Sequence, residues 1–388
     1  MNDTVKLSTY DSFDCAKYLW THFEEESDYY VFQSFNWLKN WHDFIGSKLG
    51  IRPCITVVEK PDGHLLMLLP LGIWKHRGTR CLTWLGGKIS DYHGPLLSRD
   101  FGERITAEVF ASIWEEVLKI LPRHDVIMLE KQPAVITMQD NPFLNLPCVP
   151  HPSNGHIANL PDSFDTFLRE RRNSKWIGTH KRKQRRLASH GKPGFMVATA
   201  QDDVDRILAT MIRQKSQSYR AMGVPVLFEQ DGYRDFIEYL SSRHITDSPV
   251  HLSALTLDET ILATHWGLVY KGRFYYLLPS YEHGKYSEYS PGTILLQHLF
   301  DWCIRNGVGV YDFTDGDEPY KFLWSDQEIR LYDYFAARTF RGVPYVWLLQ
   351  LKRSAKLKIK RSEKLAQIYY KLRSLKTRWK PVRPTMNN

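Results

Sequence analysis

Three closely spaced strand patterns, followed by one helix and a further strand, constrain the fold of this chain more than any other feature. Residues 250–257, 261–270 and 273–278 are strand-like, and Lys271-Gly272 between the last two is typical of a tight hairpin turn. Ser290-Pro291-Gly292 then opens a helical pattern that ends at Gly307, and residues 308–313 return as a strand. An antiparallel hairpin that continues through a helix into another strand predicts a mixed α/β sheet.

The first 150 residues show a comparable alternation. Strand patterns occupy residues 54–59, 65–74, 80–85 and 126–130, and apolar side chains have helical spacing over residues 34–45 and 101–121. Loop-like sequence at residues 147–154 marks a boundary. We therefore predict an α/β (α+β) protein with mixed sheets flanked by helices, in two lobes at residues 1–150 and 151–340, followed by a helical tail at 341–388.

The second lobe is predicted to open with a strand at residues 156–160. Asp162 is expected to cap a helix that runs into residues 169–186, which contain nine Lys or Arg and one Glu. A strand near 195–198 and helices near 204–219 and 233–243 precede the hairpin. The basic stretch has two interpretations: it steers an anionic donor, or it is a solvated helix face.

The C-terminal tail carries the positive charge of the chain. Residues 351–388 contain 13 Lys or Arg and one Glu, a balance of +12, so the other 350 residues carry −3 of the net +9. A nearly neutral body does not predict binding to DNA. Residues 344–379 are predicted to form one helix, with a narrow apolar stripe at Leu365, Ile368, Leu372, Leu375 and Trp379. Two hypotheses stay open: the helix lies on anionic lipid, or its stripe packs on the second lobe.

Other sequence features exclude several classes of protein. The N-terminus has no signal-peptide pattern, and the longest strongly apolar stretch, residues 65–74, is much shorter than a membrane span. The five cysteines form no CxxC pair, so we predict neither a disulfide framework nor a metal site. We expect a cytoplasmic protein, with peripheral association at the inner membrane through residues 344–380 as one alternative.

Three sequence segments resemble the CelD/BcsL acetyltransferase family, which is similar to the Fem peptidyltransferases and to GNAT enzymes in general. They are FQSFNWLKNWHDFIG at residues 32–46, CLTWLGGKISDYHGPLLS at 81–98, and YSEYSPGTILLQHLFDWCIRNGVGVYDFTDGDEPYKFLW at 286–324. The resemblance covers about residues 30–335. It implies two GNAT-like lobes, with the acyl-transfer machinery mainly in the second and the acceptor bound partly by the first.

The resemblance implies a donor anchor at Ser290, Gly292 and Thr293. In GNAT folds the diphosphate of the donor lies at a helix N-terminus, where backbone N–H groups and the helix dipole favour an anion. The alternative is an ordinary helix start with proline in its first turn. The sequence departs from the usual GNAT phosphate loop, because Gly292 is its only glycine and the loop has no Arg or Gln. A strand N–H within residues 273–279 would polarise the thioester carbonyl.

Catalytic candidates cluster after the last predicted strand. Asp312 is the proposed base, Lys321 an electrostatic stabiliser, and Glu318 a second carboxylate. A turn with capping carboxylates and a solvated lysine is the alternative interpretation. His265, on a predicted strand, is either an active-site group or a core histidine.

The resemblance also implies acceptor-binding residues in the first lobe, at Asp91, Tyr92 and Trp37. Asp91 and Tyr92 follow Gly86-Gly87, and their alternative interpretation is a turn aspartate beside a packed ring.

The predicted function is an acetyl-CoA-dependent N- or O-acetyltransferase acting on a sugar-containing or amine acceptor in cellulose or other cell-surface polysaccharide synthesis. An acyl carrier protein or aminoacyl-tRNA is an alternative donor. The first alternative function is a Fem-like transferase that uses aminoacyl-tRNA. The second is a non-catalytic assembly factor, tethered by its basic tail to a membrane or a synthase complex.

Overall fold

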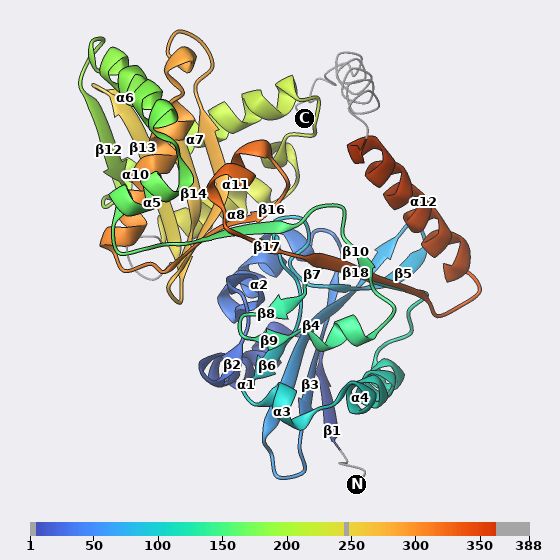
Figure 1. Ribbon diagram of the computed structural model, residues 1–388. Helices are drawn as coiled ribbons and strands as arrows, with labels where there is room; N and C mark the ends of the chain where they lie inside the picture. Colours follow the sequence, from blue (N-terminus) through green and yellow to red (C-terminus); the bar gives the residue numbers. More distant parts are fainter. Residues whose placement is uncertain (1–4, 244–247, 362–388) are drawn as a thin grey trace. The chain divides into compact units, whose positions relative to one another are not determined.

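The computed structural model describes residues 5–243 and 248–361 (Figure 1). Its contacts divide the chain into two compact units: the first holds the described residues up to Ile157 together with Thr314–Arg353, and the second holds Ala158–Phe313 with the described residues from Ser354. The sequence placed residues 314–340 in the second lobe. They group with the first unit because strand β18 (Leu331–Ala337) pairs with β7 (Val126–Pro133).

A nine-stranded mixed sheet organises the first unit. Its strands run in the order β1-β3-β4-β5-β7-β18-β10, with β6 beside β4 and β2 beside β6. The β5–β7 pair is parallel, and the neighbouring β4–β5 and β7–β18 pairs are antiparallel. The remaining strands are β1 (Lys6–Tyr10), β2 (Ser27–Asp28), β3 (Arg52–Glu59), β4 (Leu65–His76), β5 (Thr79–Trp84), β6 (Leu96–Ser98) and β10 (Val149–Pro150); β8 (Val135–Ile136) and β9 (Gln139–Asp140) form a separate ladder.

Side-chain caps explain where the helices of the first unit begin. Ser12, Ser34 and Thr106 each accept a hydrogen bond from the backbone N–H three residues later. The predicted helix at 101–121 is therefore two helices, because Thr106 starts a new one. The helices are α1 (Phe13–Glu26), α2 (Phe35–Trp41), η2 (His42–Gly46), α3 (Phe101–Arg104), α4 (Ala107–Ile120), α11 (Pro319–Trp324) and α12 (Gly342–Arg361), with short turns η1 (Val31–Gln33) and η3 (Pro142–Asn145).

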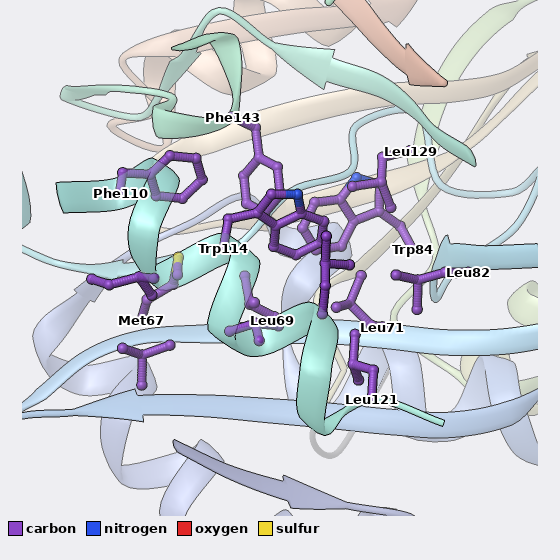
Figure 2. Close-up of a cluster of buried hydrophobic side chains, with 14 of the residues drawn as sticks. Met67, Leu69, Leu71, Leu82, Trp84, Phe110, Trp114, Leu121, Leu129 and Phe143 are labelled. Carbon is purple, nitrogen blue, oxygen red and sulfur yellow. The ribbon is translucent and has the colours of Figure 1, made fainter. Parts of the chain in front are cut away.

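The core of the first unit lies between α4 and the sheet (Figure 2). Phe143, from η3, is fully buried at its centre. Its ring meets Trp84, Phe110 and Trp114 edge to face, at centroid distances of 5.1, 5.1 and 5.0 Å. This geometry is the favourable arrangement for aromatic pairs. The ring of Phe143 in η3 therefore packs β5, which contains Trp84, against α4, which contains Phe110 and Trp114.

A second, seven-stranded mixed sheet runs in the order β12-β13-β14-β15-β16-β11-β17. Neighbours from β12 to β15 are antiparallel, whereas β15 and β16 are parallel, as a hairpin followed by a helical crossover requires. The strands are β11 (Gly155–Asn159), β12 (Pro193–Val197), β13 (Val250–Leu257), β14 (Thr260–Tyr270), β15 (Arg273–Tyr281), β16 (Val310–Asp315) and β17 (Gln327–Ile329).

Successive residues of β14 face opposite sides of the sheet, so Thr264 and Trp266 contact helices on one side and His265 lies on the other. Thr264 donates to Gln214 of α7 at 3.2 Å, and Trp266 donates to Ser241 of α8 at 2.9 Å. His265 lies in an aromatic group with His251, whose ring is 4.3 Å from Trp302 of α10. The helices are α5 (Phe164–Arg171), α6 (Ser174–Ala188), α7 (Gln201–Ala221), α8 (Tyr233–Ser242) and α10 (Pro291–Arg305), with turns η4 (Leu227–Glu229) and η5 (Ser287–Tyr289).

Two helix predictions need correction. The helix expected from Asp162 through 186 is two helices, because Ser163 occupies the N-cap position of α5 and Asn173 caps α6 through the N–H of Trp176 at 2.9 Å. The predicted C-terminal helix begins as α12, but the stripe from Leu365 to Trp379 lies outside the described residues. Within the described ranges, no helix combines the length and apolar character that crossing a bilayer requires.

Candidate active site

The turn before α10 has a backbone conformation that its sequence does not favour. Ser290 has φ 59° and ψ 55°, in the left-handed region, and Pro291 follows as the first residue of the helix. A left-handed residue other than glycine costs about 1–2 kcal/mol, and such strain gathers at ligand sites. The Ser290 carbonyl accepts from the N–H groups of Thr293 and Ile294 at 3.0 and 3.1 Å. These two hydrogen bonds fix the conformation of the first turn of α10.

Gly292 brings the backbone of this first turn close to the end of β15. A Cβ built on Gly292 would lie 3.3 Å from Cδ1 of Tyr281, the last residue of that strand. Any longer side chain at position 292 therefore has to share space with the Tyr281 ring or with a ligand at the helix start.

The basic helix α6 lies against the same turn. Lys183 donates from Nζ to Oγ of Ser290 at 2.8 Å, and the Arg186 guanidinium lies 5.5 Å from the ring centre of Tyr289. Arg186 also lies 3.6 Å from the carboxylate of Glu288, with both side chains exposed. Two sequence candidates, the basic stretch and the Ser290 turn, are therefore in contact in the second unit through residues 107 positions apart.

Strands β15 and β16 are paired along only part of their length. The paired positions run from Arg273 with Val310 to Tyr275 with Asp312, whereas β15 continues to Tyr281. On its other edge β15 carries a bulge, because Trp266 pairs with Leu278 and Gly267 pairs with Tyr276. Leu277 is thus out of register, next to the place where β15 loses its parallel partner. Pro279, which the sequence offered as the cause of a break, remains paired with His265.

Two predicted catalytic residues are fully buried in the second unit. Asp312 accepts a hydrogen bond from Nη1 of Arg273 at 2.8 Å, so its charge is held in an ion pair. His265 stacks on Tyr276 at 4.7 Å with an interplanar angle of 6°. Burial lowers the pKa of His265 well below its usual value, and the neighbouring His251 and Lys215 act in the same direction. A substrate reaches either side chain only if this core opens.

A charged cluster occupies the first unit, and its central residue, Lys131, was not among the candidates predicted from sequence. Lys131, in the left-handed region at φ 56°, lies 3.3 Å from Oδ1 of Asp91 and 3.2 Å from Oδ2 of Asp315. Ser153 donates to Asp315 at 2.5 Å. All three charged side chains keep between a tenth and a quarter of their surface exposed. A lone lysine in a strand has no local pattern that marks it, so only tertiary pairing identifies Lys131.

Burial and pairing shift the pKa values within this cluster. Burial raises the pKa of Asp91, although the charge of Lys131 acts against this. Burial disfavours the charge of Lys131, yet Asp91 and Asp315 raise its pKa above the usual value. Burial also works against the charge of Asp315, but the Lys131 charge and the Ser153 hydrogen bond lower its pKa. Asp91 is therefore the carboxylate of the cluster most ready to take a proton.

Lys321 and Glu318 extend this cluster. The buried Nζ of Lys321 donates to the carbonyl of Asp315 at 2.9 Å and lies 3.0 Å from Oε2 of Glu318, whose side chain is 54% exposed. The charge of Lys321 also acts on Asp91. The structure thus brings together Asp91, Glu318 and Lys321 in the first unit, whereas Asp312 belongs to the second.

Tyr92 and Trp37 pack beside Asp91 as core residues. Tyr92 is fully buried, with its ring 4.9 Å from Tyr30 and 5.8 Å from Phe32. Trp37 is 3% exposed and donates from Nε1 to Ser90 at 2.8 Å. Both rings hold the loop that presents Asp91, and neither offers an open surface to a ligand.

One group in the described part of the chain has the side chains and spacing to hold a metal ion. The ligand atoms of His156, Asp317 and Glu328 lie within 4.8 Å of one another. His156 and Asp317 are already hydrogen-bonded at 3.1 Å, and Asn154 donates from its side chain to Glu328 at 3.3 Å and from its backbone to Asp317 at 3.1 Å. These contacts satisfy the group without an ion, and we assign it no role.

A groove of about 400 Å³ lies between α5, α6 and α10. Trp176, His180, Gln297 and His298 are among its lining residues. It shares two helices with the Ser290 turn, but neither Ser290 nor Gly292 lines it. The groove therefore adds no group to the site at the helix start.

Comparisons with known proteins agree with this architecture. Residues 174–322 match the family model described as an acetyltransferase (GNAT) domain. FemX has a similar structure, with a TM-score of 0.57, 10% identity, and coverage of 88% of this chain and 99% of that chain. A conserved protein of unknown function from Bacteroides thetaiotaomicron has a TM-score of 0.50 and 11% identity, over 86% of this chain and 99% of that chain. No curated protein matches the sequence. The predicted two-sheet α/β fold is confirmed.

Proposed function

We propose, from the premise that residues 174–322 form a GNAT acyltransferase domain, that this protein transfers an acetyl group from acetyl-CoA to an amine or hydroxyl acceptor. One observation carries the choice of donor: Lys183 lies 2.8 Å from Ser290 at the start of α10. A helix N-terminus with a lysine beside it suits a diphosphate, because N–H dipoles and a cation then act on the same anion. Lys183 thus supplies the cation that the loop itself lacks.

The part of β15 that is no longer paired with β16 suits the rest of the donor. Beyond Tyr275 the edge of β15 offers backbone groups to the amide-containing arm of CoA, next to the bulge at Leu277. An N–H at this bulge is our candidate for polarising the thioester carbonyl. The acceptor nitrogen or oxygen then bonds to the carbonyl carbon, the C–S bond breaks, and the CoA thiolate takes a proton as the acceptor loses one.

The acceptor is proposed to bind through the charged cluster of the first unit. Asp91, Lys131 and Asp315 present alternating charges that are partly accessible, as recognition of a polar sugar or amine needs, and the buried Lys321 adds a further positive charge. Resemblance to the CelD/BcsL family supports a cell-surface polysaccharide precursor as the acceptor. A cytoplasmic location belongs to the same proposal.

Titration calorimetry with acetyl-CoA tests the donor. We expect a micromolar dissociation constant, about 8 kcal/mol of binding free energy, and about tenfold weaker binding by Lys183→Met because a charged hydrogen bond to phosphate is lost. Lys181→Met is the matched control, since it removes the same charge from the same helix two positions away. Absence of binding by the unmodified protein would reject acetyl-CoA and turn attention to a carrier-protein or aminoacyl-tRNA donor.

Release of the CoA thiol, with glucosamine as the first probe in a panel of amines and sugars, tests catalysis. The sequence proposed Asp312 as the base, but its ion pair with Arg273 makes the exposed Glu318 beside Lys321 a competing candidate. If Glu318 is the base, Glu318→Gln lowers kcat about a hundredfold and leaves acetyl-CoA affinity unchanged. If Glu318→Gln retains full kcat and Asp312→Asn loses it, the role belongs to Asp312. No thiol release with any member of the panel would contradict the acceptor class.

A further inference from the structure

Helix α12 is fixed to the first unit by one of its faces. Tyr345, Val346 and Leu349 pack on a small core formed by Cys81, Val126 and Met128. The hydroxyl of Tyr345 lies 2.8 Å from Nδ1 of His76 on β4. The helix is therefore held in a defined orientation on the sheet, and its opposite face is equally defined.

That opposite face exposes large apolar side chains. Val343, Trp347 and Leu351 follow one another at intervals of four residues, with Leu348 beside them and Phe340 just before the helix. Their exposed fractions are 55, 63, 45, 43 and 98%, respectively. We call these five residues the apolar stripe of α12. Single exposed apolar residues are ordinary, but a continuous set along one helix face marks a contact surface.

The charge distribution of the chain indicates which kind of partner the apolar stripe of α12 contacts. The stripe leads directly into residues 351–388, which have a balance of +12, whereas the remainder of the protein has −3. Apolar and tryptophan side chains on a helix, continued by lysines and arginines, match the layering of a membrane surface of acidic phospholipids. Nucleic acid matches the charge but offers no partner for Val343, Leu348 and Leu351.

We propose that α12 docks this protein on an anionic lipid surface, to which the positive charge balance of residues 351–388 attracts it. Phe340, Trp347 and Leu351 enter the headgroup boundary. This inference rests on the outer face of α12 and the charge of the tail. It stands independently of the proposed acyl transfer.

Co-sedimentation of the full-length protein with phosphatidylcholine vesicles, with and without phosphatidylglycerol, tests the proposal. We expect binding only to the anionic vesicles, and at least about tenfold weaker binding when Phe340, Trp347 and Leu351 are all changed to Ser, because apolar burial in the bilayer boundary is lost. Tyr18→Ser is the matched control, since Tyr18 is 75% exposed on α1 of the same unit. Acetyl-CoA affinity should be the same in all these proteins.

A second measurement covers the case in which the triple variant fails to fold. Vesicles with brominated acyl chains should quench part of the tryptophan fluorescence of a Trp379→Phe variant, whose tail has no tryptophan, and the further change Trp347→Phe should remove that quenching. Trp347 is the only tryptophan among the large apolar residues that the described structure exposes. Unchanged vesicle binding by a folded triple variant would overturn the proposal, as would binding to transfer RNA without binding to anionic vesicles.

Discussion

Replacing Gly292 with Glu is expected to weaken acetyl-CoA binding on the order of a hundredfold, about 2.7 kcal/mol. Position 292 is in the first turn of α10, and a Cβ atom built there would lie 3.3 Å from Cδ1 of the Tyr281 ring. A carboxylate there competes with the diphosphate for the helix N-terminus and repels it electrostatically. Titration calorimetry measures the loss directly.

The design of this variant separates binding from folding. An acidic side chain in the first turn of a helix is favourable to the helix dipole, so Gly292→Glu should melt no lower than Gly292→Gln. The Gln variant has the same bulk without the charge, and we expect it to lose less affinity than the Glu variant. Equal losses in the two would assign the effect to bulk, and full affinity in the Glu variant would reject α10 as the donor anchor.

Replacing Phe143 with Ala is expected to destabilise the first unit by about 3–5 kcal/mol. The ring is completely buried and contacts three other aromatic rings at once, so its removal leaves a cavity that rigid neighbours cannot fill (Figure 2). Urea denaturation followed by tryptophan fluorescence reports the change, because Trp84 and Trp114 line the cavity.

Ile120→Ala is the control for this measurement. Ile120 ends α4, the helix that supplies Trp114, and is 45% exposed, so its truncation should change the unfolding free energy by less than about 0.5 kcal/mol. If Phe143→Ala were as stable as Ile120→Ala, the η3 turn would not be part of the core that Figure 2 shows.

Local sequence patterns determined most helices and strands, and they also located the Ser290 turn of the proposed donor site. Strand β13 has the predicted bounds, and the Lys271-Gly272 turn joins β14 to β15 as the hairpin pattern predicts. The Ser290-Pro291-Gly292 start and the Gly307 end of α10 were also predictable, because a fixed proline φ and a glycine after a helix act within a few residues.

Only the tertiary structure decided which distant groups meet. The pairing of β18 with β7 assigns residues 314–353 to the first unit, although nothing in the local pattern of a strand specifies its sheet. Lys183 meets Ser290, Lys131 meets Asp91 and Asp315, and Asp312 is neutralised by Arg273 through side chains far apart in sequence. Local propensity acts over one turn or one strand, whereas charge pairing depends on where packing places each side chain. The sequence therefore named most of the candidate groups, though not Lys131, and the fold decided which of them are available for chemistry.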